Sequence, residues 1–576
     1  MTLGSRALRA SAVVLLMVTS WAGVTAERPP EVVDVQLLAI NDFHGNLEPP
    51  SGSNGRIRQT LAGGAEFMAA HLAALKATNP NTVIVSAGDN IGATPPISSL
   101  FHDEPSIESL NAAGVQISAV GNHELDEGWW ELRRVAAGGC HPTDGCQDGT
   151  PYDGARFEFL AANITLDPRK VAPKVLTASG WKGPRGRKPG PLFPASTVKK
   201  IGGVKVGFIG LTLEGAPQII MPSALTGLAF HPEAAAANAE AARLRGKGTR
   251  TIVVLIHEGG VPADDDPNGC RDLTGPIVPI VEAMSGDIDV VVSGHTHRSY
   301  VCTIAGKLVT SAESYSRLVT DIDLQIDRKT GRVLSKRARN VTATRDVPPQ
   351  ADQTRLIEHY RPFSAKVGGR QVGSLAASVN RSDNPAGETA LGEMVADAML
   401  EASSDPARGG AVVALANPGG VRADLTRPAD AEAGVATPVT YADASAVLPF
   451  GNITVVMTLT GDVLVQLLEE QFDRVPGRWT MLQVSRGFSY AFDPSRPAGQ
   501  RIDRASVTIS GRPVLATDRV RVASLDFIWN GGDRFTVVKE ATDPVTSGEA
   551  LEQFVAYLGR HSPVSPGPRD RVRRLP

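Results

Sequence analysis

Residues 115–126 read VQISAVGNHELD, an apolar run that ends in the polar group Gly121-Asn122-His123-Glu124. Short apolar runs of this kind, separated by helix-like segments, are typical of buried strands in an α/β sheet. Four other apolar runs end in a similar way, at the groups Asp42-Phe43-His44, Gly88-Asp89, His257-Glu258 and Gly294-His295-Thr296-His297. Because open α/β sheets place their ligands beyond the carboxyl ends of strands, we expect all five groups to line one rim.

These five groups are rich in residues that bind metals. Carboxylates and imidazoles that converge on one rim can hold two divalent cations. Five of the eleven histidines lie within the groups. The other six have no such neighbours in the sequence, and we interpret them as ordinary surface or core residues: His71, His102, His141, His231, His359 and His561. The pattern therefore predicts a metal-dependent hydrolase.

The series of groups resembles that of the calcineurin-like metallophosphoesterases, and the second half of the chain resembles the C-terminal domain of the 5′-nucleotidase family. This resemblance implies an α/β protein with an N-terminal metallophosphoesterase β-sandwich flanked by helices. A linker helix would join it to a smaller α/β substrate-binding domain. The resemblance further implies two divalent metal ions, zinc, manganese or similar, bridged by Asp89. The implied ligands are Asp42, His44 and His297 at the first site, and Asn122, His257 and His295 at the second.

Such a ligand set predicts phosphoryl transfer to water. Two cations a few ångströms apart lower the pKa of a shared water and neutralise the phosphoryl oxygens, so that a bridging hydroxide attacks in line. His123 matches the catalytic histidine of the family, which stabilises the developing charge and helps the leaving oxygen depart. Asp126 is expected to orient that imidazole through a hydrogen bond. The alternative is that Asp126 is a helix N-terminal acid, favoured by the helix dipole.

The second half of the chain contains candidate substrate-binding residues. Residues 417–422 join a strand end to a glycine turn and an arginine, which is typical of a phosphate clamp, although such turns can also be structural. The resemblance implies that Phe450 and Phe527 stack on a base and that Asp533 bonds the ribose hydroxyls. Asn417 and Arg422 would lie nearer the phosphate. Relatives often place further phosphate-contacting arginines just before a helix start, but here Arg381 stands alone and further upstream, which leaves the preferred substrate open.

The N-terminus and the cysteines indicate export. Arg6 and Arg9, an apolar stretch and then Val24-Thr25-Ala26 predict a signal peptide over residues 1–26 and a secreted or periplasmic protein. No later stretch approaches the roughly 20 apolar residues of a spanning helix. Four cysteines fit an oxidising compartment, and of their three possible pairings we favour Cys140–Cys146, leaving Cys270–Cys302. The net charge of −3 disfavours a protein that coats nucleic acid.

The predicted organisation is a signal peptide (1–26), a dinuclear metallophosphoesterase domain (27–345), a linker helix (346–366) and a C-terminal substrate-binding domain (367–576). The linker stretch 352–366 reads equally well as a surface helix. Other predicted elements are helices at 232–245 and 460–472, the latter capped by Thr460, and strands at 411–416 and 520–523.

The predicted activity is removal of the 5′-phosphate from nucleotides, a small-molecule substrate, by an exported enzyme. The alternatives on the same site are a 2′,3′-cyclic-nucleotide phosphodiesterase and a nucleotide-sugar or dinucleotide pyrophosphatase. A different class, a non-catalytic binding protein on this scaffold, is disfavoured because all seven implied ligand positions carry a suitable residue.

Overall fold

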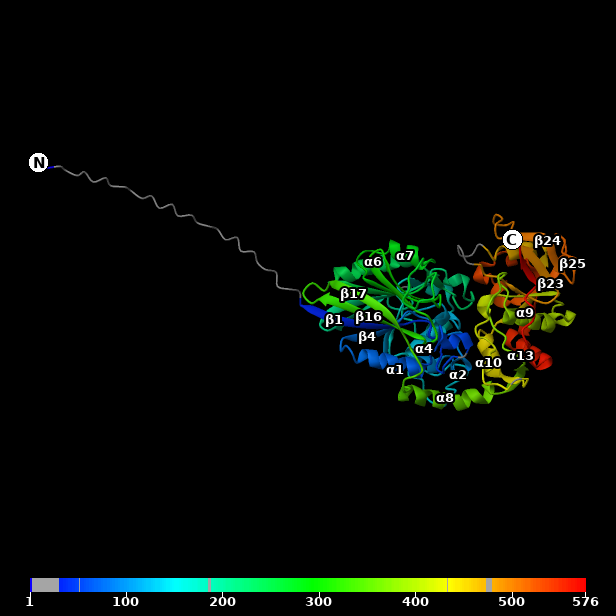
Figure 1. Ribbon diagram of the computed structural model, residues 1–576, viewed down its shortest axis with the longest axis horizontal. Coiled ribbons are helices and arrows are strands. Elements are labelled where there is room, and N and C mark those ends of the chain that lie inside the picture. Colours follow the sequence, from blue (N-terminus) through cyan, green and yellow to red (C-terminus); the bar gives the residue numbers. More distant parts are fainter. Residues whose placement is uncertain (3–30, 51, 185–187, 433, 473–478) are drawn as a thin grey trace.

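The computed structural model describes residues 1–2, 31–50, 52–184, 188–432, 434–472 and 479–576. Apart from Met1 and Thr2, the predicted signal peptide lies outside the described residues. Two α/β domains follow one another along the chain and lie side by side, as the colour change from blue and green to yellow and red shows (Figure 1). This arrangement confirms the predicted fold class.

The first domain is built on two six-stranded sheets. The strand order is β17-β16-β1-β4-β5-β6 in one sheet and β14-β15-β13-β12-β10-β9 in the other. The first sheet comprises β1 (Val32–Ile40), β4 (Thr82–Ser86), β5 (Val115–Ala119), β6 (Glu158–Leu160), β16 (Leu318–Asp327) and β17 (Val333–Thr342). The second comprises β9 (Ser196–Ile201), β10 (Val204–Thr212), β12 (Thr251–His257), β13 (Val290–Ser293), β14 (Ser299–Ile304) and β15 (Lys307–Ala312). The central strands of both sheets run parallel, so their carboxyl ends share one edge.

Alternation along the strands separates the core between the sheets from the cores outside them. In β1, Leu37 and Ala39 pack between the sheets, whereas Leu38 and Ile40 face the helices, as the twofold period of a strand requires. The helices α1 (Ala65–Lys76), α3 (Glu104–Ala113) and α4 (Trp129–Ala137) cover the outer face of the first sheet. The helices α6 (Glu233–Gly246) and α7 (Ile277–Ala283) cover the second. The result is a sandwich flanked by helices.

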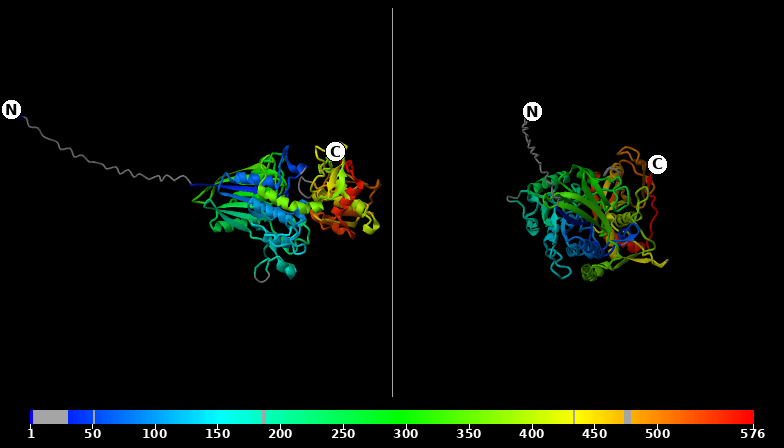
Figure 2. Two further views of the ribbon diagram at one scale, coloured as in Figure 1. Left: turned by 90° about the horizontal axis from the view of Figure 1, so that it is seen from below. Right: turned by 60° about the vertical axis from the view of Figure 1, so that its left-hand side comes forward.

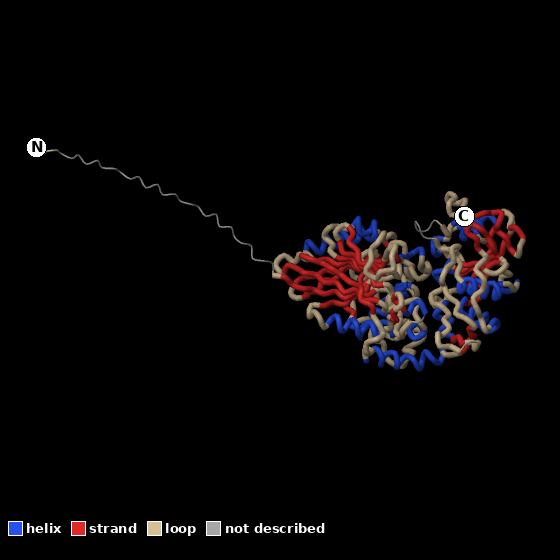
Figure 3. The backbone as a smooth tube through the Cα atoms, viewed as in Figure 1, coloured by secondary structure: helices blue, strands red, loops and turns tan. Residues whose placement is uncertain are grey.

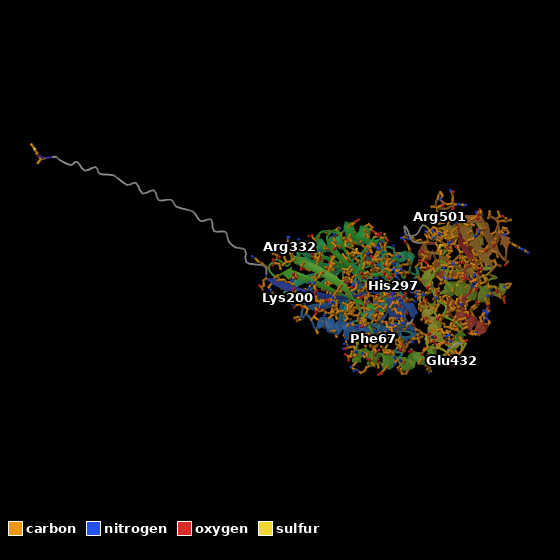
Figure 4. All side chains as sticks on the ribbon, viewed as in Figure 1. Phe67, Lys200, His297, Arg332, Glu432 and Arg501 are labelled. Carbon is orange, nitrogen blue, oxygen red and sulfur yellow. A yellow bond between two sulfur atoms is a disulfide. The ribbon has the colours of Figure 1, made fainter. Side chains whose placement is uncertain are left out.

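The strands of the first domain run toward the second domain (Figure 3). Lys200 and Arg332 mark the far end of the sandwich, while His297 lies near the boundary with the second domain (Figure 4). The parallel strands therefore direct their carboxyl ends toward the neighbouring domain. Figure 2 shows the same two-part arrangement from two further sides.

Helix α8 (Ala351–Gly368) connects the domains along one side of the molecule (Figure 1). It packs against α1, α2 (Pro96–Ser99) and α3 of the first domain and against α10 (Tyr441–Val447) of the second. The Tyr360 hydroxyl donates a 3.0 Å hydrogen bond to Glu108. The linker helix, expected within 346–366 with its helical stretch at 352–366, thus begins at Ala351 and ends at Gly368, two residues beyond the expected end.

The second domain contains a five-stranded sheet of order β22-β19-β26-β21-β27 and a four-stranded sheet of order β25-β24-β23-β28. The five-stranded sheet comprises β19 (Val413–Ala416), β21 (Ile453–Thr460), β22 (Gln483–Val484), β26 (Arg519–Leu525) and β27 (Thr542–Glu549); the other comprises β23 (Phe488–Phe492), β24 (Ile502–Ile509), β25 (Arg512–Pro513) and β28 (Val572–Arg574). Helices α9 (Ala390–Ser403), α11 (Gly461–Glu469) and α13 (Ala550–His561) pack on these sheets. Thr460 caps α11 by accepting the backbone N–H of Val463 at 3.2 Å. That helix ends at Glu469, three residues before the expected end.

The two predicted disulfides, Cys140–Cys146 and Cys270–Cys302, are both present. The first closes a short loop after α4, and the second joins the segment before α7 to strand β14. Among the described residues, no helix is both long enough and apolar enough to cross a membrane.

Candidate metal centre and substrate cavity

The five polar groups of the sequence meet at the carboxyl edge of the two sheets. Loops after β1, β4 and β5 carry Asp42 and His44, then Asp89, and then Asn122 and His123. From the second sheet, His257 is the last residue of β12, and His295 and His297 follow β13. Each sheet thus contributes side chains to the same rim.

These side chains form two clusters. Donor atoms of Asp42, His44 and His297 lie within 4.8 Å of one another, and those of Asp89, His257 and His295 do the same. Asp89 reaches both clusters, because its Oδ2 is 2.9 Å from Nε2 of His257 and 3.7 Å from Nε2 of His44. This position between the clusters fits a bridging carboxylate.

The hydrogen bonds of His44 and His257 leave the Nε2 lone pair of each ring directed at another acceptor atom. Nδ1 of His44 lies 2.8 Å from the carbonyl oxygen of Gly92, and Nδ1 of His257 lies 2.8 Å from that of Ala87. A carbonyl can only accept, so each neutral ring donates through Nδ1 and presents the lone pair of Nε2. Those Nε2 atoms face Nε2 of His297 at 3.2 Å and Oδ2 of Asp89 at 2.9 Å. In each pair, two atoms that carry lone pairs face each other, and a cation bound by both atoms would account for this arrangement.

Two further observations agree with that fit. The buried Oδ1 of Asn122 has no hydrogen-bond partner among the described residues, although buried polar atoms are nearly always paired. Burial alone would lower the pKa of His257, but Asp89 raises it to about 10, so positive charge is favoured between the two groups. Burial together with the charge of His257 lowers the pKa of His295 to about 3, which keeps that ring neutral and able to bind a metal.

The backbone at these positions is strained. Positive φ angles occur at five of the cluster residues: Asp42 (49°), His44 (45°), Asp89 (51°), His295 (71°) and His297 (51°). Residues other than glycine rarely adopt this conformation, and such strain concentrates at functional sites. The surrounding hydrogen bonds therefore hold these loops in backbone conformations that the same residues rarely adopt elsewhere.

Glu124 is a positioning residue that the sequence analysis left without a role. Its buried carboxylate accepts backbone N–H groups of Asp89 at 2.9 Å, Asn90 at 2.8 Å and Gly121 at 2.7 Å. These bonds tie the loops after β4 and β5 together. Burial and the Asp89 charge raise the pKa of Glu124 to about 7. Its position directly after Gly121-Asn122-His123 is the feature of the sequence that could have indicated this role.

His123 and Asp126 form a hydrogen-bonded pair. Nδ1 of His123 lies 2.7 Å from Oδ2 of Asp126, and the His123 backbone N–H donates to Oδ1 of Asp89 at 2.9 Å. Burial works against protonation of the imidazole, but Asp126 and Asp89 outweigh it and raise the pKa of His123. The Asp126 carboxylate is thus directed at His123, after the 3₁₀ turn His123–Leu125.

The second domain faces this rim across a cavity of about 620 Å³. The residues predicted to bind substrate all line it: Asn417, Arg422, Phe450, Phe527 and Asp533. On the opposite wall lie Asn122, His123 and Asp126. Most small-molecule sites have volumes of roughly 300–1,000 Å³, so the space suits a ligand of nucleotide size.

Phe450 of the second domain contacts His123 at the rim of the first domain. Its ring is inclined by 15° to that of His123, with 5.4 Å between the ring centres. The guanidinium of Arg422 lies 5.6 Å from the centre of the Phe450 ring. The family resemblance implies a base beside Phe450, whereas no pattern in the sequence indicates its contact with His123.

Arg381 and Trp479 also line the cavity. Arg381 donates to Oδ1 of Asp424 at 3.1 Å and to Oδ1 of Asn54, in the first domain, at 3.1 Å. It therefore spans the domain boundary although it lies upstream of the expected arginine positions. No motif in the sequence distinguished Trp479.

Two of the histidines interpreted from the sequence as ordinary surface or core residues lie close to each other in the structure. His102 and His141 do have the acidic company expected of ligand groups, and with Glu131 they bring potential donor atoms within 4.8 Å of one another. Their rings stack at 3.7 Å with 16° between the planes. The sequence could not reveal this cluster, because its members come from segments that are about 10 to 40 residues apart.

Comparison with known proteins agrees with both halves of the fold. The calcineurin-like phosphoesterase family matches residues 35–299, and the 5′-nucleotidase C-terminal domain matches residues 367–540. The chain is 29% identical to endonuclease YhcR of Bacillus subtilis over 92% of its own length, but it spans only 40% of that protein. It is also 29% identical to the cell wall protein Lmo0130 of Listeria monocytogenes, covering 93% of this chain and 68% of that protein.

Among solved structures, the 5′-nucleotidase precursor of Thermus thermophilus superimposes with a TM-score of 0.74 at 26% identity. The match covers 94% of this chain and 99% of the other. Both domains, in the same order, are therefore shared with that protein. The chain belongs to the 5′-nucleotidase family, with a metallophosphoesterase domain followed by a 5′-nucleotidase C-terminal domain.

Proposed function

We propose that this protein is an exported metal-dependent phosphohydrolase that removes the 5′-phosphate of nucleotides. The observation that carries the proposal is the cavity in which His123 faces two aromatic rings and an arginine of the second domain. A phosphate placed at the rim leaves the rest of a nucleotide pointing toward those groups. The disulfides and the similarity to a cell wall protein support export.

The two clusters would hold two divalent cations. Asp42, His44 and His297 would serve one ion, and Asn122, His257 and His295 the other, with Asp89 shared between them. When bound, such a pair of ions activates water at neutral pH and neutralises charge on the phosphoryl oxygens. Zinc and manganese both accept this mixture of imidazole and carboxylate donors.

His123 would assist the leaving group. Because Nδ1 is engaged with Asp126, Nε2 is the ring nitrogen available to the cavity. The raised pKa of His123 keeps the ring protonated, so Nε2–H can donate to the ester oxygen as charge develops there. Asp126 fixes the orientation of the ring and stabilises its positive charge.

The second domain would supply specificity. Arg422 influences the electrostatics of His44, His123 and His297, so its charge reaches the place where a phosphate would lie. The buried Oδ1 of Asn417 has no hydrogen-bond partner among the described residues and lines the cavity, which suits a substrate donor. Phe450 and Phe527 offer aromatic faces to a base, and Asp533 offers a carboxylate to the ribose hydroxyls.

Hydrolysis of a phosphodiester is the second candidate. It is favoured by the similarity to a protein named as an endonuclease over 92% of this chain. Most of that relative lies outside the match, so its named activity can reside elsewhere. The cyclic-nucleotide and pyrophosphatase alternatives share the same metal clusters and differ only in what the cavity admits.

The deciding experiment follows hydrolysis, with and without chelator, by phosphate release from AMP, UMP and a simple aryl phosphate. For 2′,3′-cyclic AMP, UDP-glucose and a linear oligonucleotide, whose first cleavage frees no inorganic phosphate, the products are measured by chromatography. Our proposal expects chelator-sensitive release that is fastest for the nucleoside monophosphates. Faster cleavage of the cyclic nucleotide, the sugar nucleotide or the oligonucleotide would replace the proposed substrate. Turnover that survives full removal of metal would overturn the proposed chemistry.

A further inference from the structure

A further group of side chains with potential metal-donor atoms lies at another part of the cavity wall. His102 and Glu131 line the cavity, and His141 stacks on His102 from the adjacent loop. The three donor atoms lie within 4.8 Å of one another. The side chains of both histidines are more than four-fifths buried. None of these residues belongs to the two clusters at the strand ends.

Both imidazoles face carboxylates. Nε2 of His102 lies 2.8 Å from Oδ2 of Asp144, and Nδ1 of His141 lies 3.3 Å from the same oxygen. Nδ1 of His102 lies 3.0 Å from Oε2 of Glu127. A single carboxylate oxygen thus approaches ring nitrogens from two separate segments, and the Asp144 backbone N–H also donates to Nδ1 of His141 at 3.3 Å.

The group contains more carboxylates than basic side chains. Four carboxylates gather here, from Glu104, Glu127, Glu131 and Asp144, and Arg134 pairs with only two of them, Glu104 and Glu131. With neutral imidazoles the group keeps a net negative charge. Hydrogen bonding to Glu127, helped by Asp144 against the effect of burial, raises the pKa of His102 to about 9.

The chain positions this group by covalent and backbone constraints. His141 and Asp144 lie inside the loop that the Cys140–Cys146 disulfide closes. His102 occupies a strained backbone position with φ of 50°, followed by Asp103 at 61°. The carboxylate of Asp103 anchors that turn by accepting from Ser98 at 2.7 Å and from the backbone of Gly92 at 2.8 Å. The backbone that carries each histidine is therefore held in place by these contacts.

We propose that His102, Glu131 and His141, with Asp144 as a further carboxylate, form a third divalent-cation site, separate from the two clusters at the strand ends. Two imidazoles with carboxylates favour a zinc-type transition ion over calcium or magnesium, which prefer oxygen alone. The bound ion ties the disulfide loop to the wall of the substrate cavity.

The test counts metal. Protein stripped with chelator is dialysed against zinc, and bound zinc per chain is measured by elemental analysis. His141→Gln should bind about one equivalent less than the wild type. His231→Gln is the matched control, since that imidazole pairs with Thr165 well outside the cluster, and it should bind as much as the wild type. Equal zinc in His141→Gln and wild type would overturn the proposal.

Two further variants protect the result from a folding defect and separate the sites. Asp144→Asn changes a side chain that is 43% exposed, and it should weaken binding of the same equivalent at least tenfold while circular dichroism is unchanged. Asp89→Asn should lower zinc at the strand-end clusters, and combining it with His141→Gln should add the two losses. If Asp89→Asn removes the equivalent that His141→Gln removes, there is no separate third site.

A spectroscopic measurement identifies the ligands. Cobalt(II) loaded into the wild type and into His141→Gln should give a difference spectrum in the visible region that reports imidazole coordination. Replacing Cys140 and Cys146 by serine should weaken the same cobalt signal, because two ligand residues lose their covalent constraint. A signal unaffected by both changes would place the cobalt elsewhere and contradict the assignment.

Discussion

Asp89 shows how much depends on one residue of this site. Its Oδ1 accepts the backbone N–H of His123, while Oδ2 faces the imidazoles of His44 and His257. The same carboxylate therefore holds the backbone of His123, the proposed catalytic residue, and lies between the two proposed cation sites. Its backbone is strained at a φ of 51°, and Glu124 holds its N–H.

Asp89→Asn should lose most turnover and a substantial part of the bound metal. The amide keeps the shape of the side chain but removes the negative charge that both cations would share. Elemental analysis and phosphate release, measured on the same preparation, check this. His297→Gln is the comparison variant: an amide oxygen can still coordinate, so partial activity should remain. Wild-type metal content in Asp89→Asn would refute the bridging role.

His123→Ala should keep its metals and lose about 10²- to 10⁴-fold in kcat, the usual contribution of a general acid. The reason is that Nδ1 of this ring is committed to Asp126, so the side chain acts on the leaving group and not on a cation. Asp126→Asn should cost less, because it orients the ring. Loss of metal from His123→Ala would identify His123 as a ligand instead. Kinetics and metal content together decide.

At the scale of elements, the strands at the rim were predictable and the contacts between loops were not. The run before Asn122 becomes β5 and the run ending at His257 becomes β12, because continuous apolar stretches bury both faces of a central strand. The stacking of Phe450 on His123 depends on how two domains meet, and no local pattern records that. The end of α11 at Glu469 was missed because the apolar Phe472 belongs to the core beyond the helix.

Helix α9 offers a prediction on stability. Glu393 is buried beside Glu388, Asp397 and Arg571, and burial raises its pKa from 4.5 to about 8 despite the arginine. The folded protein therefore keeps a proton that the unfolded chain releases above pH 4.5. Stability from this residue falls as the pH rises from about 4.5 to about 8. Glu393→Gln should thus stabilise the protein by about 1–3 kcal/mol at pH 9 and change little at pH 4.5.

Denaturant unfolding at the two pH values measures this difference. Glu401→Gln, on the same helix, is the control with the opposite sign. Burial acts against its ionisation, but His561, Arg560 and Arg486 lower its pKa, so its loss should destabilise the protein at pH 9. A greater gain for Glu393→Gln at pH 4.5 than at pH 9 would contradict the assignment of a buried, protonated carboxyl.

At the scale of the molecule, the proposed function places chemistry in the first domain and substrate recognition in the second. Phe527→Ala should raise KM for AMP about 5- to 150-fold, since stacking is worth about 1–3 kcal/mol per base, and leave an aryl phosphate nearly unaffected. Phe363→Ala, an exposed ring on α8, is the matched control and should change neither substrate. Phe450→Ala should affect both substrates, because its ring also contacts His123. Equal losses on both substrates in Phe527→Ala would mark that ring as structural.

Each proposed ion takes ligands from both sheets, because Asp42 and Asp89 follow strands of one sheet whereas His257 and His297 belong to the other. The apolar core between the sheets therefore sets how far apart the ligands of each ion lie. Trimming that core at Leu255, two residues before His257 on the inner face of β12, should alter the magnetic coupling of a manganese pair without touching any ligand. Natural variation in apolar side chains far from water can thereby retune the reactivity of the rim.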